Sequence, residues 1–245
     1  LEHFLYRHAA AVVVMAEGAV DQLISEGVDR TRIHYIPNGG EPSEFVASRP
    51  RTELRAHYGF DRMTFVYAGA HGPANGLDLL ISAAAHVRDL PVDIVLVGGG
   101  VDKERVRRLA ETAGLDNVRF LDPIPKSEIA DLLTAADVGL HVLADVDLFR
   151  RAVSPNKVFD YMAAGLPVLT NCPGLVADLV AGSGAGIAVD PEDLAAGIRT
   201  MAQLTPEQLW NHGDHGREWI VENQSRTAMA RRLEDVLDEV AALGR

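Results

Sequence analysis

The sequence predicts an α/β fold, in which a parallel β-sheet carries helices on both faces and is followed by a helical tail. Short apolar segments rich in Val and Ile alternate with helical patterns along most of the chain, and this alternation is typical of βαβ units. Most of these segments are continuously apolar, as expected for strands that are buried on both faces. From residue 206 onward the chain shows only helical patterns.

Each predicted strand is short, rich in β-branched or aromatic residues, and bounded by Gly, Pro, Asn or Asp. In chain order the strands are expected at residues 11–15, 33–36, 64–67, 93–97, 118–121, 138–142, 167–170 and 186–189. Between them, apolar residues recur at helical spacing. Helices are expected at residues 20–26, 52–58, 77–88, 103–113, 126–135, 157–164 and 192–201, and two long ones between 206 and 243.

Turn chemistry marks the domain boundaries. The segment IPNGGEP at residues 36–42 combines Pro, Asn and Gly, which supply the backbone angles of turns. The chain starts at Leu1 with residues typical of the middle of a fold, so we expect a fragment or a processed chain. The expected units are the tail end of an N-terminal domain (1–40), a linker (41–60), a complete second domain (61–225) and a C-terminal helix that packs back toward the first domain (226–245).

The composition excludes several classes of function. The 245 residues include 23 Lys plus Arg and 35 Asp plus Glu, which gives a net charge of −12. Nucleic acid requires a broad basic face, so no nucleic-acid partner is expected and an anionic ligand needs a local binding device. The single cysteine, Cys172, excludes an internal disulfide and a Cys-rich metal site and fits a reducing compartment. No apolar run approaches the roughly 20 residues of a membrane span. We therefore expect a cytoplasmic protein, or one that is peripheral at the inner face of a membrane.

Two glycine-rich segments follow predicted strands, at the sheet edge where open α/β folds bind ligands. In AGAHGPANG, residues 68–76, the glycines (among them Gly69 and Gly72) let backbone N–H groups approach a phosphate at the start of the next helix. Such turns are also common for packing alone, and the segment matches neither a P-loop nor Gly-x-Gly-x-x-Gly. Both interpretations therefore stay open. The second segment, GGG from Gly98, is interpreted as a flexible turn that can also line the ligand cleft.

A third segment, SPNKVFDYMAAGLP at residues 154–167, predicts a helix with an unusual start. Ser154 is expected to cap the helix and Pro155 to occupy its first position. Lys157 then lies in the first turn, where a cation is unfavourable beside the helix dipole unless an anion binds there. Asp160 follows about one turn later on nearly the same face, so the two side chains could hold a phosphate and sugar hydroxyls. An exposed Lys157–Asp160 ion pair is the alternative.

Other candidate ligands carry a weaker signal. The segment HGDH at residues 212–215 looks like a metal cluster, but it has no further ligand at metal spacing. We therefore expect a surface turn there and no metal site in the protein. Of the scattered histidines, only His71 and His141 fall at strand ends where ligands are expected. Trp210 and Trp219 are expected on the apolar side of the tail helices.

Taken in order, these segments resemble the C-terminal, nucleotide-sugar-binding half of a family-4 retaining glycosyltransferase of the GT-B fold, from the bacterial polysaccharide-assembly branch. The resemblance covers nearly the whole chain. The segments that carry the resemblance are VVV at 12–14, YAG at 67–69, LVGGG at 96–100, NVRF at 117–120 and, as the most specific, the stretch from 154 to 168. The resemblance implies two Rossmann-like domains facing a cleft. It also implies a hexosyltransferase that moves a sugar, with retention, from a UDP- or GDP-type nucleotide sugar to a glycan or lipid-linked acceptor, without metal or other cofactor.

The resemblance also assigns roles to residues. The family's two acids, eight positions apart, map onto Ala152 and Asp160, so the first acid is missing; the family's loop Arg and Lys map onto Ala70 and Asn75. These departures fit a branch of the family in which Lys157 stabilises the diphosphate. They equally fit a weak or lost activity. No catalytic residue is identified. The base is expected against the segment after the strand at 118–121. The residues assigned to the nucleotide sugar are Gly69, His71, Gly72, Gly98, Ile124, Ser154, Asn156, Lys157 and Asp160.

Two alternatives share the same fold: a non-catalytic nucleotide-sugar-binding subunit, which the missing acid at Ala152 would favour, and a sugar-nucleotide epimerase, which needs no acceptor. A nicotinamide oxidoreductase ranks last, because its glycine fingerprint is missing. Residues 1–40 are too few to bury an acceptor, so we expect poor transfer by the isolated chain. We also expect self-association, or binding of a missing N-terminal domain, through an exposed stripe of the last helix at Leu233, Val236 and Val240.

Overall fold

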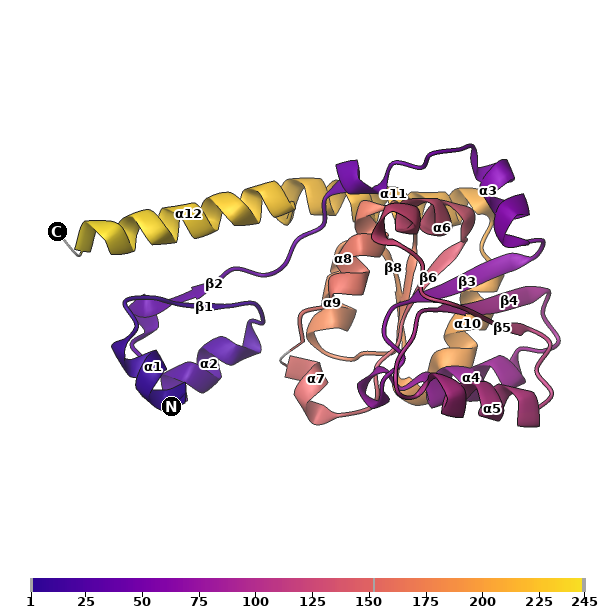
Figure 1. Ribbon diagram of the computed structural model, residues 1–245, viewed down its shortest axis with the longest axis horizontal. Helices are drawn as coiled ribbons and strands as arrows, with labels where there is room; N and C mark the ends of the chain where they lie inside the picture. The colour runs from indigo at the N-terminus through magenta and orange to yellow at the C-terminus, as the bar shows by residue number, and fades with distance from the viewer. Residues whose placement is uncertain (1, 152, 244–245) are drawn as a thin grey trace.

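The structure is a computed structural model and describes residues 2–151 and 153–243. Its main feature is a six-stranded sheet with the order β5-β4-β3-β6-β7-β8 (Figure 1). All neighbouring pairs in this sheet are parallel. The strands are β3 (Met63–Ala68), β4 (Val92–Val97), β5 (Val118–Leu121), β6 (Val138–His141), β7 (Val168–Thr170) and β8 (Gly186–Ala188).

Helices cover both faces of this sheet. They are α3 (Arg51–Tyr58), α4 (Leu77–His86), α5 (Lys103–Thr112), α6 (Ile129–Ala135), α8 (Asn156–Ala163), α9 (Leu175–Gly182), α10 (Leu194–Ala202) and α11 (Pro206–Asn223). Helices α4, α5 and α10 pack with Phe65 and Ile94 on one face, and the other five pack with Val66 and Val95 on the opposite face. Successive residues of a strand point to opposite faces, so the continuously apolar strands supply both clusters.

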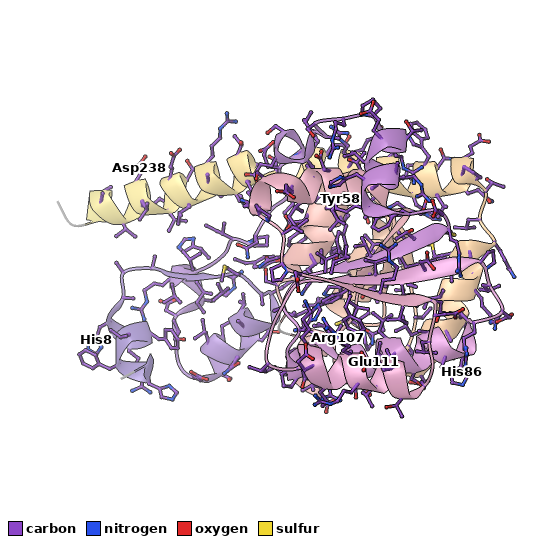
Figure 2. The ribbon with its side chains drawn as sticks, turned by 45° about the vertical axis from the view of Figure 1, so that its right-hand side comes forward. His8, Tyr58, His86, Arg107, Glu111 and Asp238 are labelled. Atoms are coloured by element: carbon purple, nitrogen blue, oxygen red, sulfur yellow. The ribbon has the colours of Figure 1, made fainter. Side chains whose placement is uncertain are left out.

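A separate two-stranded parallel sheet pairs β1 (Val12–Val14) with β2 (Ile33–Tyr35). With α1 (Glu2–His8) and α2 (Gly18–Ser25) it forms a small N-terminal unit around Val20 and Leu23. Figure 1 shows this unit beside the six-stranded domain, with α12 (Arg226–Leu243) extending from the domain along it. In Figure 2, His8 marks the end of α1 and Asp238 the outer part of α12.

The predicted α/β fold is confirmed, and the predicted helical tail is formed by α11 and α12. Each of the eight predicted strands is present, with bounds that differ by one residue at most. Three short helices were not predicted: α1, α7 (Asp147–Arg151) and α9. The two buried residues of α9, Val176 and Val180, are a single turn apart, which is too short a pattern to distinguish a helix from a loop.

The last helix differs in part from the expected apolar stripe. Leu233 is exposed as expected, and Val240 is partly exposed. Val236 is buried, because it packs against Ile36 and Met229, so its predicted exposure is wrong. Neither this helix nor another within the described ranges is long and apolar enough to cross a membrane.

Candidate functional site

The strand order places a crevice at the carboxyl ends of β3 and β6. From β3 the sheet continues outward through β4 to β5, and from β6 it continues in the opposite direction to β8. Loops that leave neighbouring strands in opposite directions open a crevice, and open α/β sheets bind ligands there. Gly69 follows β3 at this point, and α8 brings the side chain of Lys157 against it.

Two glycine-rich loops pair with each other at this edge. The Gly69 N–H donates to the Val97 carbonyl at 2.9 Å and the His71 N–H to the Gly99 carbonyl at 2.8 Å, so the ladder of β3 and β4 continues beyond the strands. A Cβ added to Gly98 would lie 1.9 Å from the Gly69 carbonyl oxygen. The second loop is therefore a tightly packed turn, and its flexibility stays a prediction.

Lys157 reaches from α8 into the crevice with unused hydrogen-bonding capacity. Its Nζ lies 5.2 Å from the centre of the Tyr67 ring. Among the described residues its only hydrogen bond is a long one, 3.4 Å, to Asn75 Oδ1, and no carboxylate pairs with it. Burial lowers the pKa of Lys157, and the charge of Asp160 raises it. The crevice thus contains a partly buried cation that can still donate to a ligand.

A second lysine at the same edge has no such capacity. Lys103 is buried, and its Nζ donates to Gly98 O at 2.9 Å, Leu121 O at 3.0 Å and Asp122 Oδ1 at 2.9 Å. An ammonium group has three hydrogens, so all three are used. Lys103 therefore holds together the loops that follow β4 and β5.

The start of α8 differs from the prediction. The helix begins at Asn156 with Pro155 in the N-cap position, and no side chain caps it. Ser154 instead accepts a hydrogen bond from Asn38 Nδ2 at 3.3 Å, and the same amide donates to Asn156 Oδ1 at 2.7 Å. The predicted Ser154 cap is wrong, because this side chain faces the N-terminal segment. The first N–H groups of α8 have no partner within the helix, and Lys157 is the second residue of that turn.

Asp160 lies one turn after Lys157, but its partner is Arg226. Its Oδ1 accepts from Arg226 Nη2 at 3.1 Å, and Oδ2 makes no hydrogen bond within the described part of the chain. Burial raises the pKa of Asp160, while Arg226 and then Lys126 lower it. The described residues contain no Lys157–Asp160 ion pair within 4 Å, so the alternative interpretation of these two residues is not supported.

Two cavities meet at Asp160. The smaller, of about 170 Å³, is lined by Gly69, Lys157 and Asp160 together with residues of α6. The larger, of about 670 Å³, lies between the segment after β2, the start of α8 and α12, and Asn156 lines it. Lys126 and Asp160 line both. The structure therefore gathers four of the predicted site residues around two cavities that share Lys126 and Asp160 in their linings.

Other predicted residues lie outside both linings. Gly72 precedes a short 3₁₀ turn, and Ile124 packs against the hydrophobic core. Arg150, in the short helix α7 that precedes α8, pairs with Asp145 at 2.8 Å. Ala152, the position of the missing acid, lies outside the described residues.

The two histidines at the strand ends are buried and uncharged near neutral pH. Neither ring nitrogen of His71 makes a hydrogen bond within the described residues. Burial and then the charge of Lys103 lower the pKa of His71, although the nearby Val97 carbonyl acts in the opposite direction without reaching hydrogen-bond geometry. His141 Nδ1 lies 2.9 Å from Thr170 Oγ1, and burial lowers the pKa of His141 to about 3. Neither ring supplies positive charge to the crevice.

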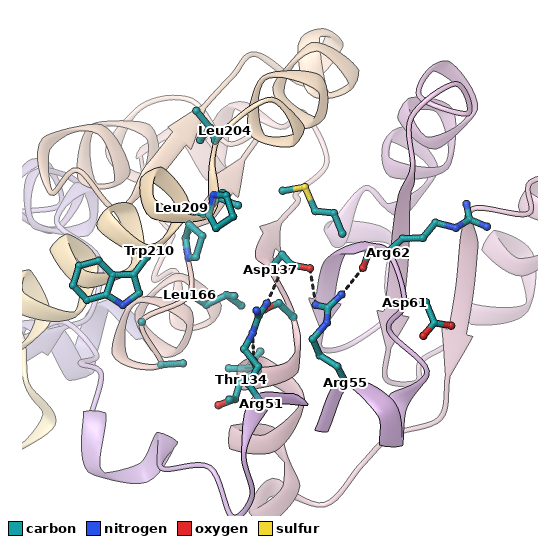
Figure 3. Close-up of a pocket in the computed structure, with 17 residues that line it drawn as sticks. Arg51, Arg55, Asp61, Arg62, Thr134, Asp137, Leu166, Leu204, Leu209 and Trp210 are labelled. Carbon is teal, nitrogen blue, oxygen red and sulfur yellow. Dashed lines mark hydrogen bonds and ion pairs between the residues drawn. The ribbon is translucent and has the colours of Figure 1, made fainter. Parts of the chain in front are cut away.

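The cavity in Figure 3, of about 610 Å³, lies at the opposite, amino-terminal edge of the sheet. Asp137 accepts there from Arg51 at 2.5 Å and Arg55 at 2.8 Å. Both arginines also donate to carbonyl groups at the C-terminal end of α6, so they stabilise the helix end. Trp210 lines this cavity and is exposed, which contradicts its predicted apolar position, whereas Trp219 packs against the core as expected.

The HGDH segment at 212–215 lies within α11, so the predicted surface turn is wrong. His212 Nδ1 lies 2.7 Å from the Gly184 carbonyl oxygen. A Cβ on Gly213 would lie 2.0 Å from the Gly165 carbonyl oxygen, so this glycine permits close packing of α11 and does not break the helix. In the described ranges, no three His, Cys, Asp or Glu side chains gather as a metal site would require.

The sequence did not single out three charged residues of the site, which are Glu44, Lys126 and Arg226. Glu44 Oε2 lies 2.5 Å from Arg226 Nη1 and 3.3 Å from Lys126 Nζ. Lys126 belongs to the segment expected near the base, but Glu44 and Arg226 are 182 positions apart. No periodicity or spacing rule connects residues at such a separation.

Comparisons with known proteins agree with this architecture. A family model described as "Glycosyl transferases group 1" matches residues 62–205, and one described as "Glycosyl transferase 4-like domain" matches residues 1–39. A GDP-mannose-dependent alpha-(1-6)-phosphatidylinositol monomannoside mannosyltransferase of Mycobacterium tuberculosis is 29% identical over 217 residues, 84% of this chain and 55% of that protein. A D-inositol 3-phosphate glycosyltransferase of Corynebacterium urealyticum is 25% identical over 219 residues, 83% and 50% of the two chains.

Among solved structures, HepE of Anabaena, in complex with UDP and glucose, superimposes with a TM-score of 0.80 at 20% identity. The match covers 96% of this chain and 64% of HepE, and it shows a shared fold. The chain spans about half the length of the curated relatives described above.

Proposed function

The chain belongs to the group 1 glycosyl transferases, and we propose that it binds a nucleotide-diphosphate sugar in the crevice between β3 and β6. The further proposal is that the whole protein transfers the sugar, with retention, to a glycan or lipid-linked acceptor. The observation that carries the proposal is the ammonium group of Lys157, which is partly buried, lacks a carboxylate partner among the described residues, and lies beside Gly69 at the sheet's switch point.

A diphosphate is the ligand that completes this arrangement. Its negative charge would neutralise Lys157. Its oxygens would accept hydrogen bonds from the Lys157 ammonium hydrogens that do not bond to Asn75. The same charge is favourable at the N-terminus of α8, which reverses the unfavourable position of a lysine in that turn. When the sugar departs, charge develops on the leaving diphosphate, and fixed donors at this point would stabilise it.

Asp160 is the residue that we assign to the ribose. It lies one helical turn beyond Lys157 on the lining of the same cavity, and its Oδ2 is free to accept from a hydroxyl group in the described structure. The relatives do not fix the base: the mycobacterial enzyme is named as GDP-mannose-dependent, whereas HepE was crystallised with UDP and glucose. Both nucleotides are therefore used in the tests.

The chain is expected to bind UDP or GDP without a divalent metal, because Lys157 and the α8 N-terminus supply the positive charge that a metal would otherwise bring. Calorimetric titrations with each nucleotide, with and without a chelator, measure this. Equal affinity in the two conditions is the expected result. Loss of binding in the presence of the chelator would contradict the metal-free site.

Replacement of Asp160 by asparagine is expected to weaken nucleotide binding by about 1–3 kcal/mol, the contribution of hydrogen bonds to a charged acceptor. Thermal unfolding of the variant should stay close to wild type, since Asp160 is only partly buried. The affinities are compared by the same calorimetric titration. An unchanged affinity would mean that Asp160 does not bind the nucleotide and only forms the ion pair with Arg226.

Transfer is separated from the two alternatives by its dependence on an acceptor. A transferase releases the nucleoside diphosphate faster when an acceptor is supplied, an epimerase changes the sugar without one, and a binding subunit does neither. Product analysis of the whole protein with UDP-glucose and GDP-mannose, with and without a glycan or polyprenyl-linked acceptor, distinguishes the three.

A further inference from the structure

Arg226, the first residue of α12, connects three separate parts of the molecule. Its Nη2 donates to Asp160 Oδ1 at 3.1 Å, its Nη1 to Glu44 Oε2 at 2.5 Å and its Nε to the Gly39 carbonyl at 3.1 Å. A guanidinium group presents its donors in a fixed planar fork. The position of the Asp160 carboxylate is therefore tied to the segment 36–50, which joins the N-terminal unit to the six-stranded domain and is called the linker from here on.

The backbone around Arg226 is seated directly on this linker. The Arg226 N–H donates to the Gly40 carbonyl at 3.1 Å, and the Gly40 N–H donates to Gln224 O at 3.2 Å. A Cβ on Gly39 would lie 2.4 Å from the same Gln224 oxygen. The linker also reaches α8 through the hydrogen bonds of Asn38. The turn between α11 and α12 and the linker thus form one packed unit.

We propose that Arg226 is a positioning residue of the nucleotide site, which acts through Asp160 by holding its carboxylate in place and by linking it to the interdomain linker at Glu44 and Gly39. This inference rests on the proposed function, because it concerns how the same site binds its nucleotide. Arg226 itself need not touch the ligand. Three of its five N–H donors are already used by acceptors of the protein.

The charges around Asp160 make Arg226 its main electrostatic support. The groups that face Asp160 are Arg226, Lys126, Glu44 and Lys157, and of the three cations Arg226 lowers the pKa of Asp160 most. Burial and Glu44 raise that pKa. Loss of Arg226 would therefore raise it further, so the carboxylate would become protonated, and a poorer acceptor, at a higher pH than in the wild type.

The test compares Arg226→Gln with Arg226→Lys and, as matched control, Arg231→Gln, which removes one charge from an exposed position of the same helix. UDP-glucose and GDP-mannose are the probes, because they lack the terminal phosphate whose second pKa lies near 6. Affinities are measured between about pH 4.5 and 8. Thermal unfolding of each variant checks that it is folded.

Arg226→Gln is expected to weaken binding about 10-fold at neutral pH and to move the acid limb of the affinity profile to higher pH. Arg226→Lys should recover part of the affinity, and Arg231→Gln should match the wild type. In an Asp160→Asn background, Arg226→Gln should add less than about a twofold loss and should not move the profile, because the residue it acts through is already neutral.

The outcomes separate two failures. If the wild type binds neither probe, the proposed function is wrong. If the wild type binds a probe but Arg226→Gln changes neither affinity nor pH profile, the positioning role is wrong. A loss of the same size in the Asp160→Asn background would likewise overturn it, since Arg226 would then act on the structure in general and not on Asp160.

Discussion

Replacing Lys157 by methionine is expected to weaken nucleotide-sugar binding about 100-fold or more, close to 3 kcal/mol, while the melting temperature stays the same or rises. The loss of affinity and the unchanged or higher melting temperature have the same cause. In the free protein the Lys157 ammonium is partly desolvated, and within the described residues it gains a single long hydrogen bond in return. A partly buried charge without a carboxylate partner destabilises the fold, and the ligand supplies the missing anion.

Methionine is the informative substitution, because it keeps the length and the apolar stem of the side chain. That stem packs against Gly69, whereas the ammonium nitrogen lies over the Tyr67 ring. The variant therefore removes the charge and its contact with the ring, and it leaves the packing of the stem. Affinities are measured by calorimetry with UDP-glucose and GDP-mannose, and stability by differential scanning calorimetry of the unliganded chain.

Lys103 provides a control at the same sheet edge. Lys103→Met removes a cation whose three donors are all satisfied within the protein, so we expect a loss of stability on the order of 2 kcal/mol. Below the unfolding transition, its nucleotide affinity should fall by less than 10-fold. If Lys157→Met lowered the melting temperature and left affinity unchanged, the roles of the two lysines would be the reverse of those assigned here.

The sheet could be predicted because its signal is local. All six residues of strand β4 are buried, and five of them are apolar. Such an apolar run is recognisable without reference to distant parts of the chain. The glycine-rich segment at Gly69 and the basic helix start at Lys157 were recognisable for the same reason: each is a short pattern next to a predicted strand or helix. The crevice then follows from where parallel strands end.

The remaining features depend on contacts between distant segments. Ser154 has the composition of an N-cap, but it faces Asn38, 116 positions away, and the helix starts beyond it. The HGDH segment suggested a turn because of Gly213, whereas this glycine is needed where α11 meets Gly165. Arg226 has no local pattern at all. Its partners are set by the return of the chain to the linker.

Gly98→Ala is expected to be the most damaging small substitution in the six-stranded domain, with a loss of about 4 kcal/mol in the free energy of unfolding. Two costs add. Gly98 has a φ of +140°, a conformation that costs a side-chain-bearing residue about 1–3 kcal/mol. Its new Cβ would also lie 1.9 Å from the Gly69 carbonyl oxygen, so the two paired loops must separate, at a cost of about 1–3 kcal/mol.

Gly114→Ala isolates the first cost. Gly114 also has a positive φ, +60°, but an added Cβ would meet nothing within 4 Å, so we expect about 1 kcal/mol of backbone strain only. For a chain of this size, 1 kcal/mol corresponds to a shift of about 2–4 °C in melting temperature. Calorimetric scans should therefore show a fall of about 10 °C for Gly98→Ala and about 3 °C for Gly114→Ala.

The separation of the loops also predicts an effect on binding that the control lacks. Gly98 is held by Lys103 through its carbonyl and lies against Gly69, which lies against Lys157. Displacing Gly69 moves the surface against which the ammonium group packs, so Gly98→Ala should weaken nucleotide binding well below its melting temperature, and Gly114→Ala should not. Equal melting temperatures for the two variants would mean that the loops yield without resistance, and the rigid crevice inferred from their pairing would then be wrong.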